Sequence, residues 1–164
     1  MRLAAGIALA TFAADQALKW YVVHGLRLWE RGAIDVIPPF LNLRMAWNYG
    51  INFGLFGHDA PWMRWALIAL ALAISAAVWV WASRERHRPL VQISAGLLMG
   101  GAVGNVVDRV IYGAVADFLN MSCCGIRNPY AFNVADIAIF AGAIGLALFT
   151  GGGKDGPRRR AKGA

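Results

Sequence analysis

The sequence predicts an all-α polytopic membrane protein: four transmembrane helices, a small extracytoplasmic β-sheet and both termini in the cytoplasm. Three observations lead to this fold class. The 164 residues are 59% hydrophobic with a mean hydropathy of +0.50, above the range of ordinary soluble domains. Several apolar stretches are long enough to cross a bilayer, and the basic residues cluster in short segments between them.

Each of the predicted spans has roughly 20 residues, which as a helix rising about 1.5 Å per residue crosses about 30 Å of hydrocarbon. The spans are Leu3–Val23, Trp62–Ala82, Leu90–Tyr112 and Ala131–Phe149. The first resembles a cleaved signal peptide because Arg2 precedes an apolar run. Asp15 and Lys19 interrupt that run, however, and no small-residue cleavage pattern follows. We therefore expect this helix in the mature protein.

The charges of the connecting segments predict the orientation. Arg84, Arg86 and Arg88 lie between the second and third spans, and five Lys and Arg residues lie in the tail at 151–164. Excess positive charge of this kind is typical of cytoplasmic segments. We expect a single domain at 1–150 and a basic cytoplasmic tail. The net charge of +7 therefore reflects membrane topology, and we expect no nucleic-acid partner.

The outer loop at about 24–61 is long and has balanced charges. It contains β-branched and alternating pieces at 34–37 and 41–45, which predict a small antiparallel sheet.

Ionisable residues inside the first and third spans need an explanation, because charges in a membrane are costly and usually face a partner. Asp15 and Lys19 are spaced i,i+4 and can pair on one helical face. A structural ion pair and a functional role both remain open for them. In the third span, Asn105 and Asp108 share a face, whereas Arg109 points about 100° away from Asp108, so we expect separate partners for these two charges. Nearby glycines favour close helix packing.

Two further carboxylates, Asp117 and Asp136, are predicted near the same membrane face, at the facing ends of the third and fourth spans. Neither has a basic residue at helical spacing to neutralise it, which is hard to explain as scaffold. Two adjacent carboxyl groups share a proton, so that one activates water while the other donates a proton. The three histidines are scattered, so neither a zinc site nor a serine triad is predicted.

Two other classes of function fit part of this pattern. In a small proton- or ion-coupled transporter, intramembrane acids form a relay, but they then spread across membrane depth and the chain often contains a repeat. Here the acids concentrate towards one face and no repeat is seen. A membrane scaffold explains the glycines of the third span but leaves Asp117 and Asp136 without a role.

Five strings in order resemble the lipoprotein signal peptidase family, also called signal peptidase II. They are Asp15-Gln-Ala-Leu-Lys19, Asn48-Tyr-Gly-Ile-Asn-Phe53, Gly101-Ala-Val-Gly-Asn-Val-Val-Asp-Arg109, Val115-Ala-Asp-Phe118 and Phe132-Asn-Val-Ala-Asp136. Each string alone is weak, and the third is the most specific. Their order on a four-helix frame of this length carries the resemblance.

The resemblance implies an aspartic endopeptidase that removes the signal peptide from prolipoproteins, on the amino side of a cysteine carrying diacylglycerol. It implies a plasma-membrane enzyme with an extracytoplasmic active site, a β-cradle and a lid helix. It requires no cofactor and no metal, and a monomer is expected, in contact with membrane lipids. The family's catalytic pair falls on Asp117 and Asp136. Supporting positions fall on Asp15, Lys19, Asn48, Gly50, Gly104, Asn105, Asp108, Arg109, Asn133 and Ala135.

Two features depart from the family's pattern. Ile51 and Asn52 stand where the family usually has two small residues, which puts the local detail of the lid in doubt. Cys123 and Cys124 are adjacent, so a disulfide between them is strained and their spacing suits no metal. No chemistry is assigned to them.

Overall fold

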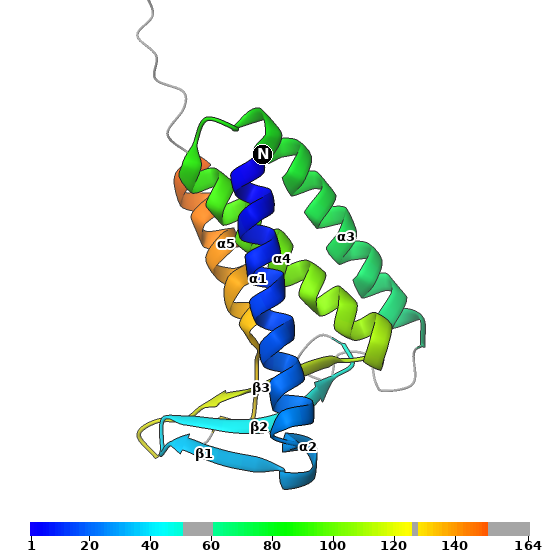
Figure 1. Ribbon diagram of the computed structural model, residues 1–164, viewed down its shortest axis with the longest axis vertical. Coiled ribbons are helices and arrows are strands. Elements are labelled where there is room, and N and C mark those ends of the chain that lie inside the picture. Colours follow the sequence, from blue (N-terminus) through cyan, green and yellow to red (C-terminus); the bar gives the residue numbers. More distant parts are fainter. Residues whose placement is uncertain (51–60, 126–127, 151–164) are drawn as a thin grey trace, which may run out of the picture.

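The computed structural model describes residues 1–50, 61–125 and 128–150, and places a helical bundle above a small sheet (Figure 1). The bundle helices are α1 (Arg2–Trp20), α3 (Pro61–Arg84), α4 (Pro89–Tyr112) and α5 (Val134–Thr150). A π-helical turn, η1 (Tyr21–Gly25), continues α1 and leads to the short helix α2 (Leu28–Arg31). The strands are β1 (Ala33–Ile37), β2 (Leu41–Asn48) and β3 (Val115–Met121).

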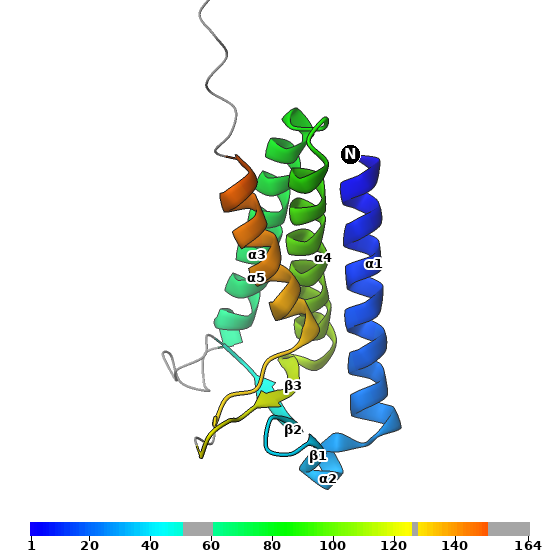
Figure 2. The same ribbon diagram turned by 90° about the vertical axis from the view of Figure 1, so that its left-hand side faces the viewer.

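Helix α4 is the centre of the bundle and contacts α1, α3 and α5 (Figure 2). Glycines on its surface allow this close packing. A Cβ atom on Gly101 would lie 2.5 Å from the carbonyl oxygen of Ala135, and one on Gly96 would lie 2.7 Å from that of Ala4. These glycines let α5 and α1 approach to backbone contact, as small residues do between membrane helices.

Two of the described helices, α3 and α4, are long and apolar enough to cross a membrane. In α4 the apolar stretch is 72% buried inside the protein, whereas in α3 it is only 11% buried. The large apolar side chains of α3 therefore face the surroundings of the bundle. Helix α5 is apolar but has only 17 residues.

The fourth predicted span began at Ala131, whereas α5 begins at Val134. Phe132 is instead paired with Leu119 of β3, and its carbonyl accepts the backbone N–H groups of Phe118 and Leu119. The apolar pattern alone did not reveal this pairing, because Ala131 and Phe132 are as apolar as the helix that follows them.

The predicted sheet of the first outer loop is confirmed, and it gains a third strand from elsewhere in the chain. The order is β1-β2-β3, with both pairs antiparallel. Asp117 was predicted at the end of the third span, but it lies in β3, opposite Ala46. A buried cluster of Val22, Leu28 and Phe118 joins this sheet to the end of the first helix.

The turn after β3 contains the two adjacent cysteines. Cys123 and Cys124 are joined in a disulfide. The backbone φ is 60° at Cys124 and 82° at Gly125, so the chain reverses sharply here through left-handed conformations.

Candidate active site

Asp117 is a buried carboxylate on β3, at the end of the sheet nearest the helices. Its side chain is 1% exposed. Asn48 lies on β2, two residues beyond Ala46, the register partner of Asp117. Its Nδ2 donates to Asp117 Oδ2 at 3.1 Å. Asn133 donates from Nδ2 to Asp117 Oδ1 at 2.7 Å. Both carboxylate oxygens therefore accept an amide N–H group.

Asp136 is held by the way α5 begins. Asn133 caps this helix: Asp136 N–H donates to Asn133 Oδ1 at 2.9 Å, and Asn133 N–H donates back to Asp136 Oδ2 at 3.2 Å. This is the reciprocal arrangement of a capping box. The other oxygen, Asp136 Oδ1, accepts Asn105 Nδ2 of α4 at 2.9 Å.

The two carboxylates are thus connected through one residue, Asn133. It donates to Asp117 from its side chain and to Asp136 from its backbone. Within the described residues, neither carboxylate has a salt bridge, as the spacing of the basic residues predicted. The hydrogen bonds that the structure describes to the two carboxylates come from neutral amide groups.

This environment changes the acidity of Asp117. Burial, and after it the negative charge of Asp136, raise the pKa of Asp117 to about 7. The amide donors Asn48 and Asn133, and the positive charge of Lys19, oppose that rise. A carboxyl group with this pKa can hold or release a proton near neutral pH.

Behind the pair lies a buried ionic cluster centred on Lys19. Its Nζ lies 2.8 Å from Asp15 Oδ2 and 2.9 Å from Asp108 Oδ2, and it donates to Asn105 Oδ1 at 3.0 Å. The i,i+4 pair expected from the sequence is therefore present, with Asp108 as a second anion. The ammonium group fixes the Asn105 carbonyl oxygen, which leaves its amide facing Asp136.

The same cluster holds the backbone of both elements that carry the pair. Asp15 Oδ1 accepts the N–H of Ala135 at 2.9 Å, in the first turn of α5. Asp108 Oδ2 accepts the N–H of Ala116 at 3.1 Å, next to Asp117 in β3. Residues of α1 and α4 therefore position both carboxylates through main-chain contacts.

The remaining predicted positions surround this arrangement. Gly104 lies so close to Asp15 that a Cβ atom there would be 2.5 Å from Oδ2. The Arg109 Nη1 donates to the carbonyl of Asn105 at 3.3 Å, apart from the partners of Asp108 as expected. The N–H of Gly50 donates to Asn48 Oδ1 at 3.2 Å and orients that amide. Ile51 and Asn52 lie outside the described residues, as does the predicted basic tail.

Two polar residues were missed by the sequence analysis. Gln16 donates from Nε2 to Asp108 Oδ1 at 3.0 Å and to the carbonyl of Gly104 at 3.3 Å. Asn120 is buried on β3 and donates to the carbonyls of Asn128 and Tyr130 at 2.8 and 2.7 Å. Gln16 and Asn120 are uncharged amides, and nothing in the sequence pattern around them indicated a role in the site.

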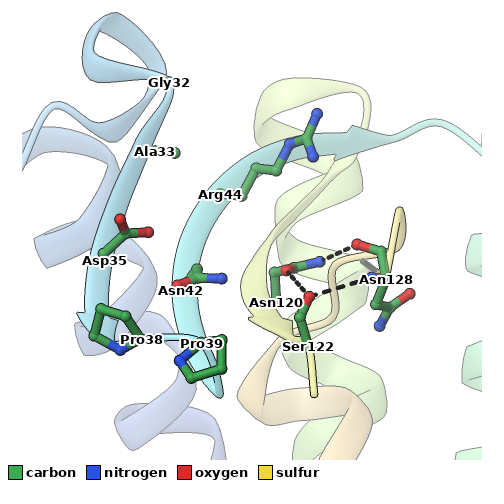
Figure 3. Close-up of a pocket in the computed structure, with 10 residues that line it drawn as sticks. All are labelled: Gly32, Ala33, Asp35, Pro38, Pro39, Asn42, Arg44, Asn120, Ser122 and Asn128. Atoms are coloured by element: carbon green, nitrogen blue, oxygen red, sulfur yellow. Dashed lines mark hydrogen bonds between the residues drawn. The ribbon is translucent and has the colours of Figure 1, made fainter. Parts of the chain in front are cut away.

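Asn120 borders a polar pocket at the outer end of the sheet (Figure 3). Ser122 donates to Asn120 Oδ1 at 3.3 Å and accepts the N–H of Asn128 at 3.2 Å. These bonds tie the end of β3 to the chain that returns to α5.

Comparison with known proteins shows which family this chain resembles. The family model described as signal peptidase (SPase) II matches residues 7–150, which include every residue of the site. The chain belongs to the signal peptidase II family. A lipoprotein signal peptidase of Methylorubrum extorquens (strain PA1) is 41% identical over 147 residues, covering 85% of this chain and 80% of that protein. Another, from Methylobacterium sp. (strain 4-46), is 43% identical over 143 residues, covering 87% and 85%.

The fold is also shared with solved structures. A bacterial membrane enzyme solved at 1.9 Å by the in meso method superposes with a TM-score of 0.76 at 26% identity, covering 92% of this chain and 95% of that one. The family resemblance drawn from the motifs is therefore confirmed. Membership in the signal peptidase II family, together with the apolar helices, marks this chain as a membrane-associated protease of lipoprotein processing.

Proposed function

We propose that this chain is an aspartic endopeptidase that removes the signal peptide from diacylglyceryl-modified prolipoproteins, cutting on the amino side of the lipidated cysteine. The observation that carries the proposal is the pair Asp117 and Asp136, linked through Asn133, with the pKa of Asp117 at about 7. The similarity to lipoprotein signal peptidases supports the substrate class.

In the proposed mechanism the pair holds one proton, because two nearby carboxylates do not both ionise readily. The ionised carboxylate takes a proton from a water molecule, which attacks the scissile carbonyl carbon. The protonated carboxyl donates its proton to the carbonyl oxygen, giving a tetrahedral gem-diol. When the gem-diol collapses, the carboxyl that took the water proton gives it to the leaving amine, the other carboxylate takes a proton from a gem-diol hydroxyl, and the peptide bond breaks. The pair returns to its starting state with one proton.

The supporting residues would act by positioning. Asn48, Asn105 and Asn133 orient the carboxylate oxygens, and the cluster around Lys19 fixes the start of α5 and of β3. Such preorganisation matters because displacement of a reacting group by about 1 Å can cost roughly 100-fold in rate.

We further propose that α1, α3, α4 and α5 all cross the membrane, with both termini in the cytoplasm. The N-terminus, the α3–α4 turn and the end of α5 lie at one end of the bundle, and the sheet lies at the other (Figure 1). The α3–α4 turn is basic, which places its end of the bundle on the cytoplasmic side in this proposal. The carboxylate pair then lies at the extracytoplasmic side, where the substrate enters from the bilayer and water reaches the scissile bond.

The direct test is cleavage of a purified diacylglyceryl-modified prolipoprotein by the purified chain in detergent, with mass spectrometry of both products. The expected cut lies immediately before the modified cysteine. The matched control is the same prolipoprotein without the lipid, which we expect to be cleaved far more slowly. A folded preparation that cuts neither substrate would contradict the proposal, and ion flux in proteoliposomes would then favour the transporter.

A further inference from the structure

The end of the bundle opposite the carboxylate pair contains a basic hollow of about 360 Å³. It is lined by Arg2 and Leu3 of α1, by Arg86 and His87 of the α3–α4 turn, and by Pro89 and Gln92 of α4. Its volume lies within the range of about 300–1,000 Å³ in which proteins bind small ligands. None of the described residues that line it is acidic.

The positive charges at this hollow are free to bind an anion. Arg2 and Arg86 are exposed, and neither forms an ion pair with any residue that the structure describes. The neighbouring Glu85 is 3.7 Å from Arg88, so its charge is directed away from Arg86. Helix α4 begins at Pro89, and its first turn adds the positive end of a helix dipole. A phosphate group suits this combination of charges.

An apolar hollow of about 340 Å³ adjoins the basic one and shares His87 and Pro89 with it. Its other walls include Leu90, Leu148 and Phe149. Leu90 and Leu148 are 51% and 69% exposed. A charged site next to an exposed apolar one fits an amphiphile, whereas a free phosphate ion would use only the basic hollow.

We propose that this end of the bundle binds an anionic glycerophospholipid. Arg2 and Arg86 contact the phosphate, and an acyl chain lies along Leu90 and Leu148. Basic pockets between membrane helices on the cytoplasmic side bind such headgroups. The inference rests on the proposed membrane orientation and is independent of the peptidase activity.

The test measures lipid binding by the purified full chain in detergent, using native mass spectrometry and thermal unfolding. The probes are phosphatidylglycerol, phosphatidylcholine and inorganic phosphate. We expect phosphatidylglycerol to bind and to raise the unfolding temperature, and the other two to do neither. In the double variant Arg2→Gln/Arg86→Gln its affinity should fall roughly 30-fold, because each arginine near an anionic headgroup contributes about 1 kcal/mol.

The matched control is Arg31→Gln/Arg44→Gln, which removes the same charge from exposed arginines at the sheet end and should bind phosphatidylglycerol normally. Equal loss in this control would show an effect of net charge alone and overturn the proposal. Equal binding of phosphatidylcholine, or an equal effect of inorganic phosphate, would overturn the lipid assignment. If the double variant does not fold, Arg86→Gln alone should bind about fivefold more weakly, and unchanged affinity there would also overturn it.

Discussion

Asn133 connects the two carboxylates and also begins the helix that carries one of them. Its side chain contributes one donor to Asp117 and one acceptor to the N–H of Asp136. An aspartate at this position would present a carboxylate to Asp117 in place of the amide donor, and an alanine would present neither group. At the scale of single residues, the amide side chain of Asn133 therefore orients one carboxylate and caps the helix that carries the other.

We predict that Asn133→Ala lowers the cleavage rate by about 100-fold, because Asp117 loses an amide donor and the helix turn that carries Asp136 loses its cap. Loss of the helix cap should cost only about 1 kcal/mol of folding free energy. Cleavage assays and thermal unfolding separate the two effects. Asn42→Ala, in the polar pocket at the outer end of the sheet, serves as the control and should retain activity. Normal cleavage by a folded Asn133→Ala variant would contradict this role.

The pKa of Asp117 predicts a pH dependence with a definite sign. Between about pH 4 and 7 the folded protein holds a proton on Asp117 that the unfolded chain has released, since its folded pKa is about 7. Rising pH through this window therefore removes stability, and the loss is complete above pH 7. We expect Asp117→Asn to be more stable than wild type at pH 8, with the difference vanishing near pH 4. Thermal unfolding at several pH values measures this stability difference, with Asp35→Asn as the control. A difference between Asp117→Asn and wild type that does not change with pH would contradict the raised pKa of Asp117.

At the scale of elements, the site depends on how closely α5 and α1 approach α4. Gly101 faces the backbone of Ala135, in the turn that carries Asp136, and Gly104 faces Asp15. The sequence predicted close helix packing at these glycines. In the structure this packing also sets the positions of Ala135, next to Asp136, and of Asp15. The strand β3 could not be predicted, because its short segment acquires its structure from β2 and Phe132, distant in sequence.

We expect Gly101→Ala to destabilise the protein and to lower cleavage at least tenfold, because the new methyl group would push the first turn of α5 away from α4. Gly6→Ala is the matched control. Nothing lies within 4 Å of a Cβ atom there, so this change in α1 should be neutral or stabilising by roughly 0.5–1 kcal/mol. Equal behaviour of the two variants in unfolding and cleavage assays would show that the close α4–α5 contact is unimportant.

At the scale of the whole molecule, one buried cluster joins all the parts that carry the site. Lys19 of α1 contacts Asp108 and Asn105 of α4, and its anionic partners hold the backbones of β3 and α5. The individual charges, and the i,i+4 pair within α1, could be predicted from the sequence. The links between helices and strand could not, because they depend on a fold that brings residues about 90–120 positions apart into contact.

We predict that Lys19→Met destabilises the protein by about 3–5 kcal/mol, because it leaves Asp15 and Asp108 buried without a positive partner. The triple variant Asp15→Asn/Lys19→Met/Asp108→Asn removes the unpaired charges and should recover much of that stability. Denaturant unfolding in detergent compares the three proteins. A triple variant less stable than Lys19→Met would show that the charges themselves are required.

The most direct measurement of the central claim compares cleavage of a diacylglyceryl-modified prolipoprotein by wild type, Asp117→Asn and Asp136→Asn, with and without a metal chelator. Asp35→Asn, an exposed aspartate of β1, is the matched control. We predict chelator-resistant cleavage by wild type and by the control, and loss of cleavage in both dyad variants while they remain folded. Near-normal cleavage by either folded dyad variant would contradict the account.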